Sequence, residues 1–159
     1  MAPKVTLRDV TLDGGSAAKH GLNIYHAGMV TLENVEISNC RWYALVVKWH
    51  GAVSVDGLTT SGNQWGVNID RGSRVTFANA AIAEGDSIVF EGQDASGSLT
   101  VESGSYQNIK TQGGSTGGTI AHQRRHRGQR SQRHRGGDHH LRRHCDRSGG
   151  QQRLRQHFC

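Results

Sequence analysis

One segment of eleven residues, VTLRDVTLDGG from Val5, recurs four more times along this chain. The later copies begin at Val30, Val53, Val75 and Leu99, so the repeat length is 22 to 25 residues. Sequences that repeat every ~20–50 residues fold by stacking one structural unit on the next. A single unit cannot bury its own apolar side, and the stack buries it instead. The chain is therefore expected to form a solenoid.

Apolar and polar residues alternate within each repeat, which is the period-two pattern of a half-buried strand. A second apolar segment, such as GLNIY from Gly21 or ALVVK from Ala44, closes each of the first four repeats. Of the 24 positions in these repeats that we expect to face inward, 23 are apolar and the exception is Thr60. The inward set of the second repeat is Val30, Leu32, Val35, Ile37, Leu45 and Val47.

The alternation breaks once in each repeat. The step from Leu7 to Val10 is three residues rather than two, and the same break separates Leu32 from Val35. We interpret the break as a corner between two short strands. Three short strands in each repeat predict a triangular coil, in which every strand pairs with its equivalent in the next coil about 4.8 Å away.

This pattern resembles the parallel β-helix repeats of the pectate lyase-like superfold. The segment GLNIYHAGMVTLENVEISNC is close to a typical repeat of that fold, and the resemblance covers roughly residues 4–121. It implies an all-β chain folded as a right-handed parallel β-helix of about five coils. The superfold serves both carbohydrate-active enzymes and non-catalytic surface proteins, so the resemblance indicates a fold and leaves the function open.

The end of the chain differs in composition from the rest. Residues 1–121 carry a formal net charge of −3, whereas residues 122–159 carry +9 and contain only two Leu and one Phe as large apolar residues. We expect Ile120 and His122 to occupy the places of Leu22 and Ile24 in a fifth coil. The chain is thus predicted to comprise a β-helix over 1–121 and a disordered basic tail over 122–159.

Three interpretations of this tail stay open. The first is that the tail is a frameshifted translation of further coils. Its His, Arg and Gln codons, read one base later, are compatible with the amino acids of β-helix repeats. Alternatively it is a native disordered segment, or a basic arm for nucleic acid; nucleic acid is not a partner that we expect. His139, His140, His144 and Cys145 match no known zinc spacing, so no metal site is predicted.

Outward charges could carry chemistry. Arg8, Glu33 and Asp56 occupy the same position of consecutive repeats, which places Glu33 and Asp56 about one strand spacing apart, close to the carboxylate separation of retaining glycosidases. A second column holds one residue from each of four consecutive repeats: Tyr25, Lys48, Asp70 and Glu91. Arg8–Glu33 and Lys48–Asp70 also suit ion pairs between neighbouring strands. The triad Arg8, Glu33 and Asp56 is therefore a weak catalytic candidate. A lyase at this position could use calcium, and no cofactor is expected otherwise.

Aromatic residues mark a candidate binding surface. Trp42 and Trp65 each lie twelve residues after the start of their repeat, and Tyr43 is adjacent. Aromatic faces spaced one coil apart can stack on sugar rings while polar neighbours bind hydroxyls. A packed aromatic ladder at a corner of the coil is the other interpretation. The candidate ligand-binding residues are Trp42, Tyr43, Trp65, Arg41, Asn63 and Gln64.

These observations favour a non-catalytic surface or secreted β-helix module, a stalk or an adhesin that contacts carbohydrate or a host. The alternative is a fragment of a pectate lyase-like polysaccharide lyase or glycoside hydrolase. The chain shows no signal peptide and no apolar run long enough to span a membrane. The parent protein is expected outside the cell or on a bacterial surface. Uncapped coils should also favour end-to-end self-association.

Overall fold

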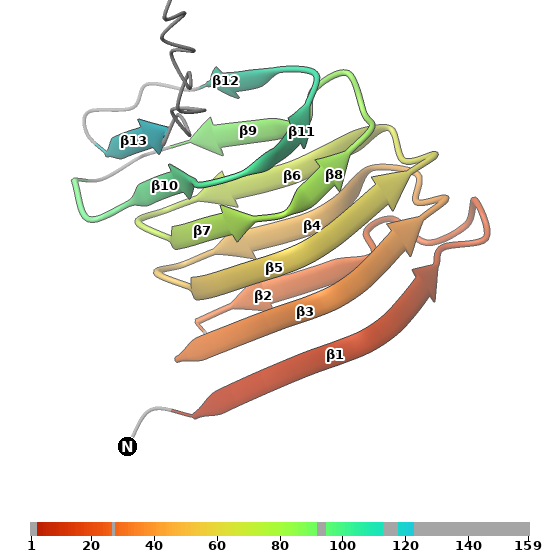
Figure 1. Cartoon of the computed structure of the whole chain (residues 1–159), viewed down its shortest axis with the longest axis horizontal. Coiled ribbons are helices and arrows are strands. Elements are labelled where there is room, and N and C mark those ends of the chain that lie inside the picture. Colours follow the sequence, from red (N-terminus) through yellow and green to blue (C-terminus); the bar gives the residue numbers. More distant parts are fainter. Residues whose placement is uncertain (1–2, 27, 92–94, 113–117, 123–159) are drawn as a thin grey trace, which may run out of the picture. The chain divides into compact units, whose positions relative to one another are not determined.

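The described residues fold entirely as strands, turns and bends. The computed structural model describes residues 3–26, 28–91, 95–112 and 118–122, and the strands in these residues form two sheets (Figure 1). Sheet A contains β1 (Lys4–Asp13), β3 (Met29–Ser38), β5 (Ala52–Ser61), β7 (Arg74–Ala78), β8 (Ala80–Ile82), β10 (Ser98–Val101), β11 (Gly104–Tyr106) and β13 (Thr119–His122). Sheet B contains β2 (Leu22–Tyr25), β4 (Tyr43–Lys48), β6 (Trp65–Asp70), β9 (Ile88–Glu91) and β12 (Ile109–Thr111).

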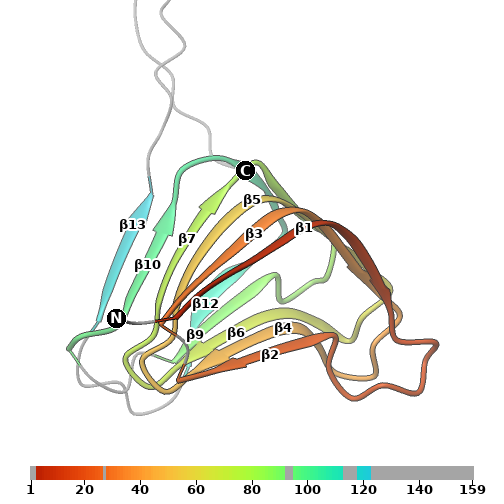
Figure 2. The ribbon, with the colours of Figure 1, turned by 90° about the horizontal axis from the view of Figure 1, so that it is seen from below.

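The strands are paired as in a solenoid. Every pairing is parallel, and each strand pairs with its equivalent in the neighbouring repeat. The chain passes from sheet A to sheet B and back once in each repeat. Viewed along the stack, sheet A arches over sheet B, and the strands of each sheet overlie one another (Figure 2). The predicted parallel β-solenoid of about five coils is confirmed.

The apolar core lies between the two sheets. All eighteen positions predicted to face inward in the second, third and fourth repeats are buried, and Thr60 is among them. The first repeat has the same pattern, but its Val5 is 48% exposed while the equivalent Val30 is 5% exposed. The difference arises because β1 lies at the edge of sheet A and pairs on one side only.

The predicted corner within each repeat is present. It bends the strand in the first three repeats, and it separates β7 from β8 and β10 from β11 in the fourth and fifth repeats. Asp9, Asn34, Gly57 and Asn79 lie at the break, and their φ values of 51–80° belong to the left-handed region. Asn, Asp and Gly tolerate this conformation better than other residues. Pairing resumes directly after the bend in β1, β3 and β5, so the first three coils have two strands each. The fourth and fifth coils have the three short strands that the sequence predicts.

The fifth coil closes earlier than the sequence pattern predicts. Ile120 pairs with Leu99 and His122 pairs with Val101, both in sheet A, so β13 begins a sixth coil. Our placement of Ile120 and His122 beside Leu22 and Ile24 was therefore wrong. The segment that closes the fifth coil is β12, which we overlooked. The predicted boundary after residue 121 falls within β13, and the rest of the predicted tail, 123–159, lies outside the described residues.

Candidate functional site

The outer face of sheet B is buried at its centre although no other strand covers it among the described residues. Val46, Asn68 and Val89 pair with one another and form one outward column of this sheet. They are 1–2% exposed, and Asp70, in the next outward column, is 4% exposed. The corresponding column of sheet A holds Thr31, Ser54, Thr76 and Thr100, all of which are exposed or half-buried. Among the side chains beside this face, Glu91 contacts Asn68 and Lys48 contacts Asp70.

One flank of this face is a cluster of aromatic rings, which we call the first aromatic cluster: His20, Trp42, Tyr43 and Trp65. The Tyr43 and Trp65 rings are 5.0 Å apart between centroids, and the Trp42 and Trp65 rings form a T-shaped pair at 6.2 Å. His20 stacks on Tyr43 at 6.1 Å and meets Trp42 at 5.7 Å. The Lys19 ammonium lies 4.0 Å from the centre of the Trp42 ring. Trp42 remains 42% exposed, so the cluster presents an open aromatic surface.

The register of this cluster differs from the prediction. Trp65 pairs with Tyr43, not with Trp42, so the two tryptophans are offset by one residue although their rings are in contact. Sequence reasoning missed His20, which precedes Gly21 as Tyr43 precedes Ala44 and Trp65 precedes Gly66. Aligning the closing segments of the repeats, rather than their starts, would have found this column.

The three polar residues predicted to flank the rings have different surroundings. Arg41 and Gln64 are exposed and available to a ligand. Asn63 is half-buried, and its amide oxygen accepts a hydrogen bond from the Cys40 backbone N–H at 2.8 Å. The Asn63 amide nitrogen donates to Glu84 Oε1 at 2.7 Å and to the Ile37 carbonyl at 3.1 Å. Asn63 therefore joins three coils and belongs to the framework beneath the cluster.

A buried polar network continues from Asn63 into the corner of the coil. Glu84 is buried and accepts a hydrogen bond from the Thr60 hydroxyl, which explains why a polar residue occupies that inward position. Ser87 donates to the Glu84 carbonyl at 2.8 Å and accepts from the Gln107 backbone N–H at 2.8 Å. A fully paired buried network of this kind fixes the turn that carries the aromatic cluster.

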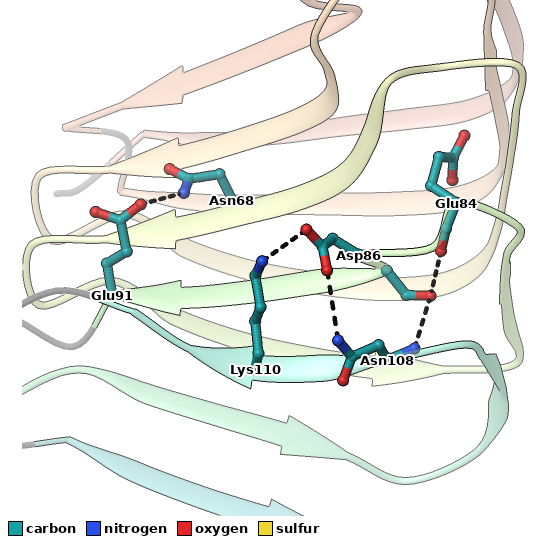
Figure 3. Close-up of polar contacts among 7 residues, drawn as sticks. Asn68, Glu84, Asp86, Glu91, Asn108 and Lys110 are labelled. Atoms are coloured by element: carbon teal, nitrogen blue, oxygen red, sulfur yellow. Dashed lines mark hydrogen bonds and ion pairs between the residues drawn. The ribbon is translucent and has the colours of Figure 1, made fainter.

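Polar groups continue the outer face of sheet B beyond the rings, as Figure 3 shows. Asn68 donates to Glu91 Oε1 at 2.7 Å, and Lys110 donates to Asp86 Oδ2 at 2.6 Å. Lys48 pairs with Asp70 at 3.5 Å, as the sequence predicted. Within the described structure, Asn68 Oδ1 and Asp70 Oδ1 are buried and accept no hydrogen bond. These oxygens are acceptors that a ligand could satisfy.

Burial changes the ionisation of the cluster. It raises the pKa of Tyr43, and the carboxylates of Glu91 and Asp86 act in the same direction. The Tyr43 hydroxyl thus keeps its proton and can donate a hydrogen bond. Burial also lowers the pKa of His20, with Lys19 and Lys48 contributing, so the neutral imidazole is favoured.

The weak catalytic candidates lie on the other sheet. Glu33 pairs with Asp56 in sheet A, and Arg8 pairs with Glu33, so all three are neighbours as predicted. The Arg8 guanidinium donates to Glu33 at 2.5 Å, and Asn79 donates to Asp56 at 2.8 Å. Each carboxylate thus has a partner already. The structure does not bring this triad together with the aromatic residues, which lie at the start of the sheet B strands.

Metal-binding and membrane-spanning features are absent from the described part of the chain. Within it, no three His, Cys, Asp or Glu side chains are grouped so as to hold a metal ion. The predicted tail residues His139, His140, His144 and Cys145 fall outside it. The same residues also include no helix with the length and apolar character of a membrane span.

Comparison with known proteins identifies the fold family. No curated protein and no solved structure matches the chain. The family model described as a right handed beta helix region matches residues 3–125, which covers every strand described above. The match agrees with the parallel pairing and the alternating inward residues. The chain therefore belongs to the right-handed β-helix family.

Proposed function

We propose that this β-helix module binds carbohydrate without cleaving it, through the first aromatic cluster at the start of the sheet B strands. The observation that carries the proposal is the open Trp42 ring, held by edge contacts with His20 and Trp65. Sugar rings present apolar C–H faces, for which a flat aromatic ring is a suitable partner. Because neighbouring rings already fix Trp42, little conformational entropy is lost on binding.

Polar groups beside the rings suit the hydroxyls of a sugar. Arg41 and Gln64 are exposed next to Trp42 and Trp65 in the sequence. Asp86 is the register neighbour of Trp65 in the next coil, since Gly66 donates to the Asp86 carbonyl and Val67 pairs with Ile88. Donors and acceptors are thus present at the edge of the aromatic surface, which is the usual composition of a ligand site.

Binding to a panel of polysaccharides tests the proposal. The panel contains neutral polymers (cellulose oligomers and xylan) and an acidic one (polygalacturonate), and binding is measured by affinity electrophoresis and calorimetry. We expect Trp42→Ala to weaken binding at least tenfold, whereas Met29→Ala, an equally exposed residue of sheet A, should leave it unchanged. Equal binding by wild type and Trp42→Ala, with thermal melts showing both folded, would contradict the proposal.

A lyase or hydrolase remains the alternative, because Glu33 and Asp56 are register neighbours. The same samples are therefore assayed for cleavage of polygalacturonate with and without calcium. Activity abolished by Glu33→Gln or Asp56→Asn would replace the binding proposal with an enzymatic one.

Two further parts of the proposal concern context. We place the parent protein outside the cell or on a bacterial surface, as a stalk or adhesin, where such glycans occur.

We also propose end-to-end association of the stack, supported by the exposed Val5 in β1 and Ile120 in β13. Light scattering at rising concentration tests this association, and a monomer throughout would refute it.

A further inference from the structure

One edge of sheet A is the strand β1, which ends the stack of coils. β1 pairs with β3 on one side, and no described strand pairs with its other side (Figure 1). The apolar residues of this first coil are incompletely covered, because Leu7, Leu12 and Leu22 are half-buried and Val5 is 48% exposed. An edge of ten residues with unpaired backbone groups is a template for another strand.

The sequence of β1, KVTLRDVTLD, is complementary to itself in the antiparallel direction. Two copies of the strand can be placed side by side with Lys4 of one opposite Asp13 of the other. In this register apolar residues face apolar residues, threonines face threonines, and each cation faces a carboxylate. The five kinds of pair are Lys4–Asp13, Val5–Leu12, Thr6–Thr11, Leu7–Val10 and Arg8–Asp9.

The shape of β1 agrees with this register. Residues directly opposite each other in an antiparallel pair point to the same face of the sheet. The four apolar residues of β1 all lie on the core side, since each pairs with a buried residue of β3. The strand bends at Asp9, where φ is 55°, and the two-fold axis of the register passes between Arg8 and Asp9. The bends of two copies therefore coincide, and their apolar sides form one continuous core.

The charge pattern distinguishes β1 from the interior strands β3 and β5. These strands also have ten residues and the same bend. The equivalent antiparallel register gives neither of them a pair of opposite charges: Glu33 would face Asn34, and Asp56 would face Gly57. The apolar symmetry therefore comes from the repeat itself, whereas the complementary charges are found on the edge strand.

We propose that two copies of this chain associate through β1 as an antiparallel, two-fold symmetric dimer, in which the stacks meet at the ends that carry β1. This inference rests on the end-to-end association proposed above, and it adds the end that is used, the register and the number of copies. The symmetry forms the Lys4–Asp13 and Arg8–Asp9 pairs twice each. A contact of this isologous kind closes after two copies and forms no filament.

The charged groups of β1 can form these pairs while keeping their present contacts. Asp13 accepts hydrogen bonds from the Gly15 N–H at 2.9 Å and from Asn39 at 3.0 Å, both through Oδ1. Asp9 likewise uses Oδ1 to accept from Asn34 at 2.7 Å. The Oδ2 atoms of both carboxylates are left for the second copy. Arg8 donates to Glu33 through Nε, and its two terminal nitrogens carry further donors.

Pairing between opposite ends of the stack is a poorer match. The last described strand of sheet A, β13, has four residues. If β1 of a second copy continued the register of the stack, Val5 would lie beside Ile120 and Leu7 beside His122. This arrangement joins no opposite charges and places an imidazole among the apolar residues of the core.

Charge reversal on β1 tests the register. Sedimentation velocity measures the dimer dissociation constant of the full chain and of the variants Lys4→Glu and Asp13→Lys. Each reversal should raise this constant by roughly tenfold or more, because like charges then face each other. An equimolar mixture of the two variants should recover wild-type association, since every introduced charge faces its opposite in the heterodimer. The control is Arg74→Glu, at the exposed equivalent of Lys4 in β7, which should leave the constant unchanged.

The outcomes separate this inference from the proposed function. Equal dissociation constants for wild type and Lys4→Glu, or a mixture that stays dissociated, overturn the inference. Assemblies that grow beyond two copies also overturn it, but they leave end-to-end association standing. A monomer at every concentration removes both, and the sugar-binding test at Trp42 is independent of all three results.

A second variant covers the case in which Asp13→Lys disturbs the turn that Asp13 holds through Gly15 and Asn39. Asp13→Asn keeps an oxygen acceptor for these two groups and removes the charge. It should weaken the dimer less than Lys4→Glu does, with an unchanged thermal melt of the folded chain. A wild-type dissociation constant for Asp13→Asn would contradict the proposed pair.

Discussion

The outer faces of the two sheets differ although both sheets cover the same core. In sheet A, outward residues such as Ser54 and Asp56 are exposed and alternate with buried ones. In sheet B, the four central residues of β4 are all buried, whichever way they point. A sheet with one solvated face shows clean alternation, whereas a sheet covered on both faces shows continuous apolar runs. The outer face of sheet B is therefore buried at its centre, and the candidate site lies beside it.

The largest expected effect is on the free energy of unfolding, and it tests whether the outer face of sheet B is buried. Val46→Asp places a charge at an outward position that is 2% exposed, and Ser54→Asp places the same charge at an exposed outward position of sheet A. An unpaired buried charge costs about 3–5 kcal/mol, whereas exposed substitutions stay within about 0.5 kcal/mol. Urea denaturation measures both free energies of unfolding. Similar values for the two variants would remove the contrast between the sheets.

A second pair of variants separates framework from surface beside the first aromatic cluster. Asn63→Ala leaves the Cys40 N–H and the Ile37 carbonyl without their side-chain partner, and we expect about 1–3 kcal/mol of destabilisation. Gln64→Ala, at the exposed neighbouring residue, should change stability by less than about 0.5 kcal/mol. If Gln64→Ala weakens glycan binding and Asn63→Ala leaves the binding of the folded fraction intact, the assignment holds. The opposite result, in which Asn63→Ala weakens glycan binding and Gln64→Ala destabilises the fold, would contradict this assignment.

The ion pairs of the two sheets offer a smaller contrast. Arg8–Glu33 lies on the exposed face of sheet A, where solvent screens the two charges, so Arg8→Met should change the free energy of unfolding little. Lys48–Asp70 involves a carboxylate that is 4% exposed, so Lys48→Met should cost more than Arg8→Met, about 1–3 kcal/mol. Arg71 still contacts Asp70 and limits the loss. Double-mutant cycles measure both coupling energies, and equal couplings would argue against a distinct environment at sheet B.

The smallest expected effect is a pH dependence from His20. Its pKa is lowered from 6.5 mainly by burial, so the unfolded chain binds this proton more readily than the folded one. The stability associated with neutral His20 is therefore present above pH 6.5 and declines as the pH falls through the lower folded pKa. His20→Gln should show a shallower loss of Tm below pH 6.5 than wild type. Parallel curves for the two proteins would count against burial of this ring.

The sequence predicted sheet A better than sheet B. Every residue that alternation predicted to face inward in the middle repeats is buried, although Cys40 and Ala44 of the core were missed. The three-residue step located the bend at Asn34. It also predicted the pairs Arg8–Glu33 and Lys48–Asp70. The closing segments were less regular, so β12 was overlooked and Trp65 was aligned with Trp42 instead of Tyr43. The turns before these segments vary in length, and counting from the start of the repeat then gives the wrong register.

The sequence by itself determined the repeat, the inward columns and the parallel stacking, because each repeat must bury its apolar side against identical neighbours. It also named Trp42, Tyr43 and Trp65. Only the tertiary structure decided that His20 joins them and that Asn63 belongs to the framework. The reason is physical: period two fixes which side of a strand a residue faces, whereas the contacts between turns depend on the path of the chain between strands.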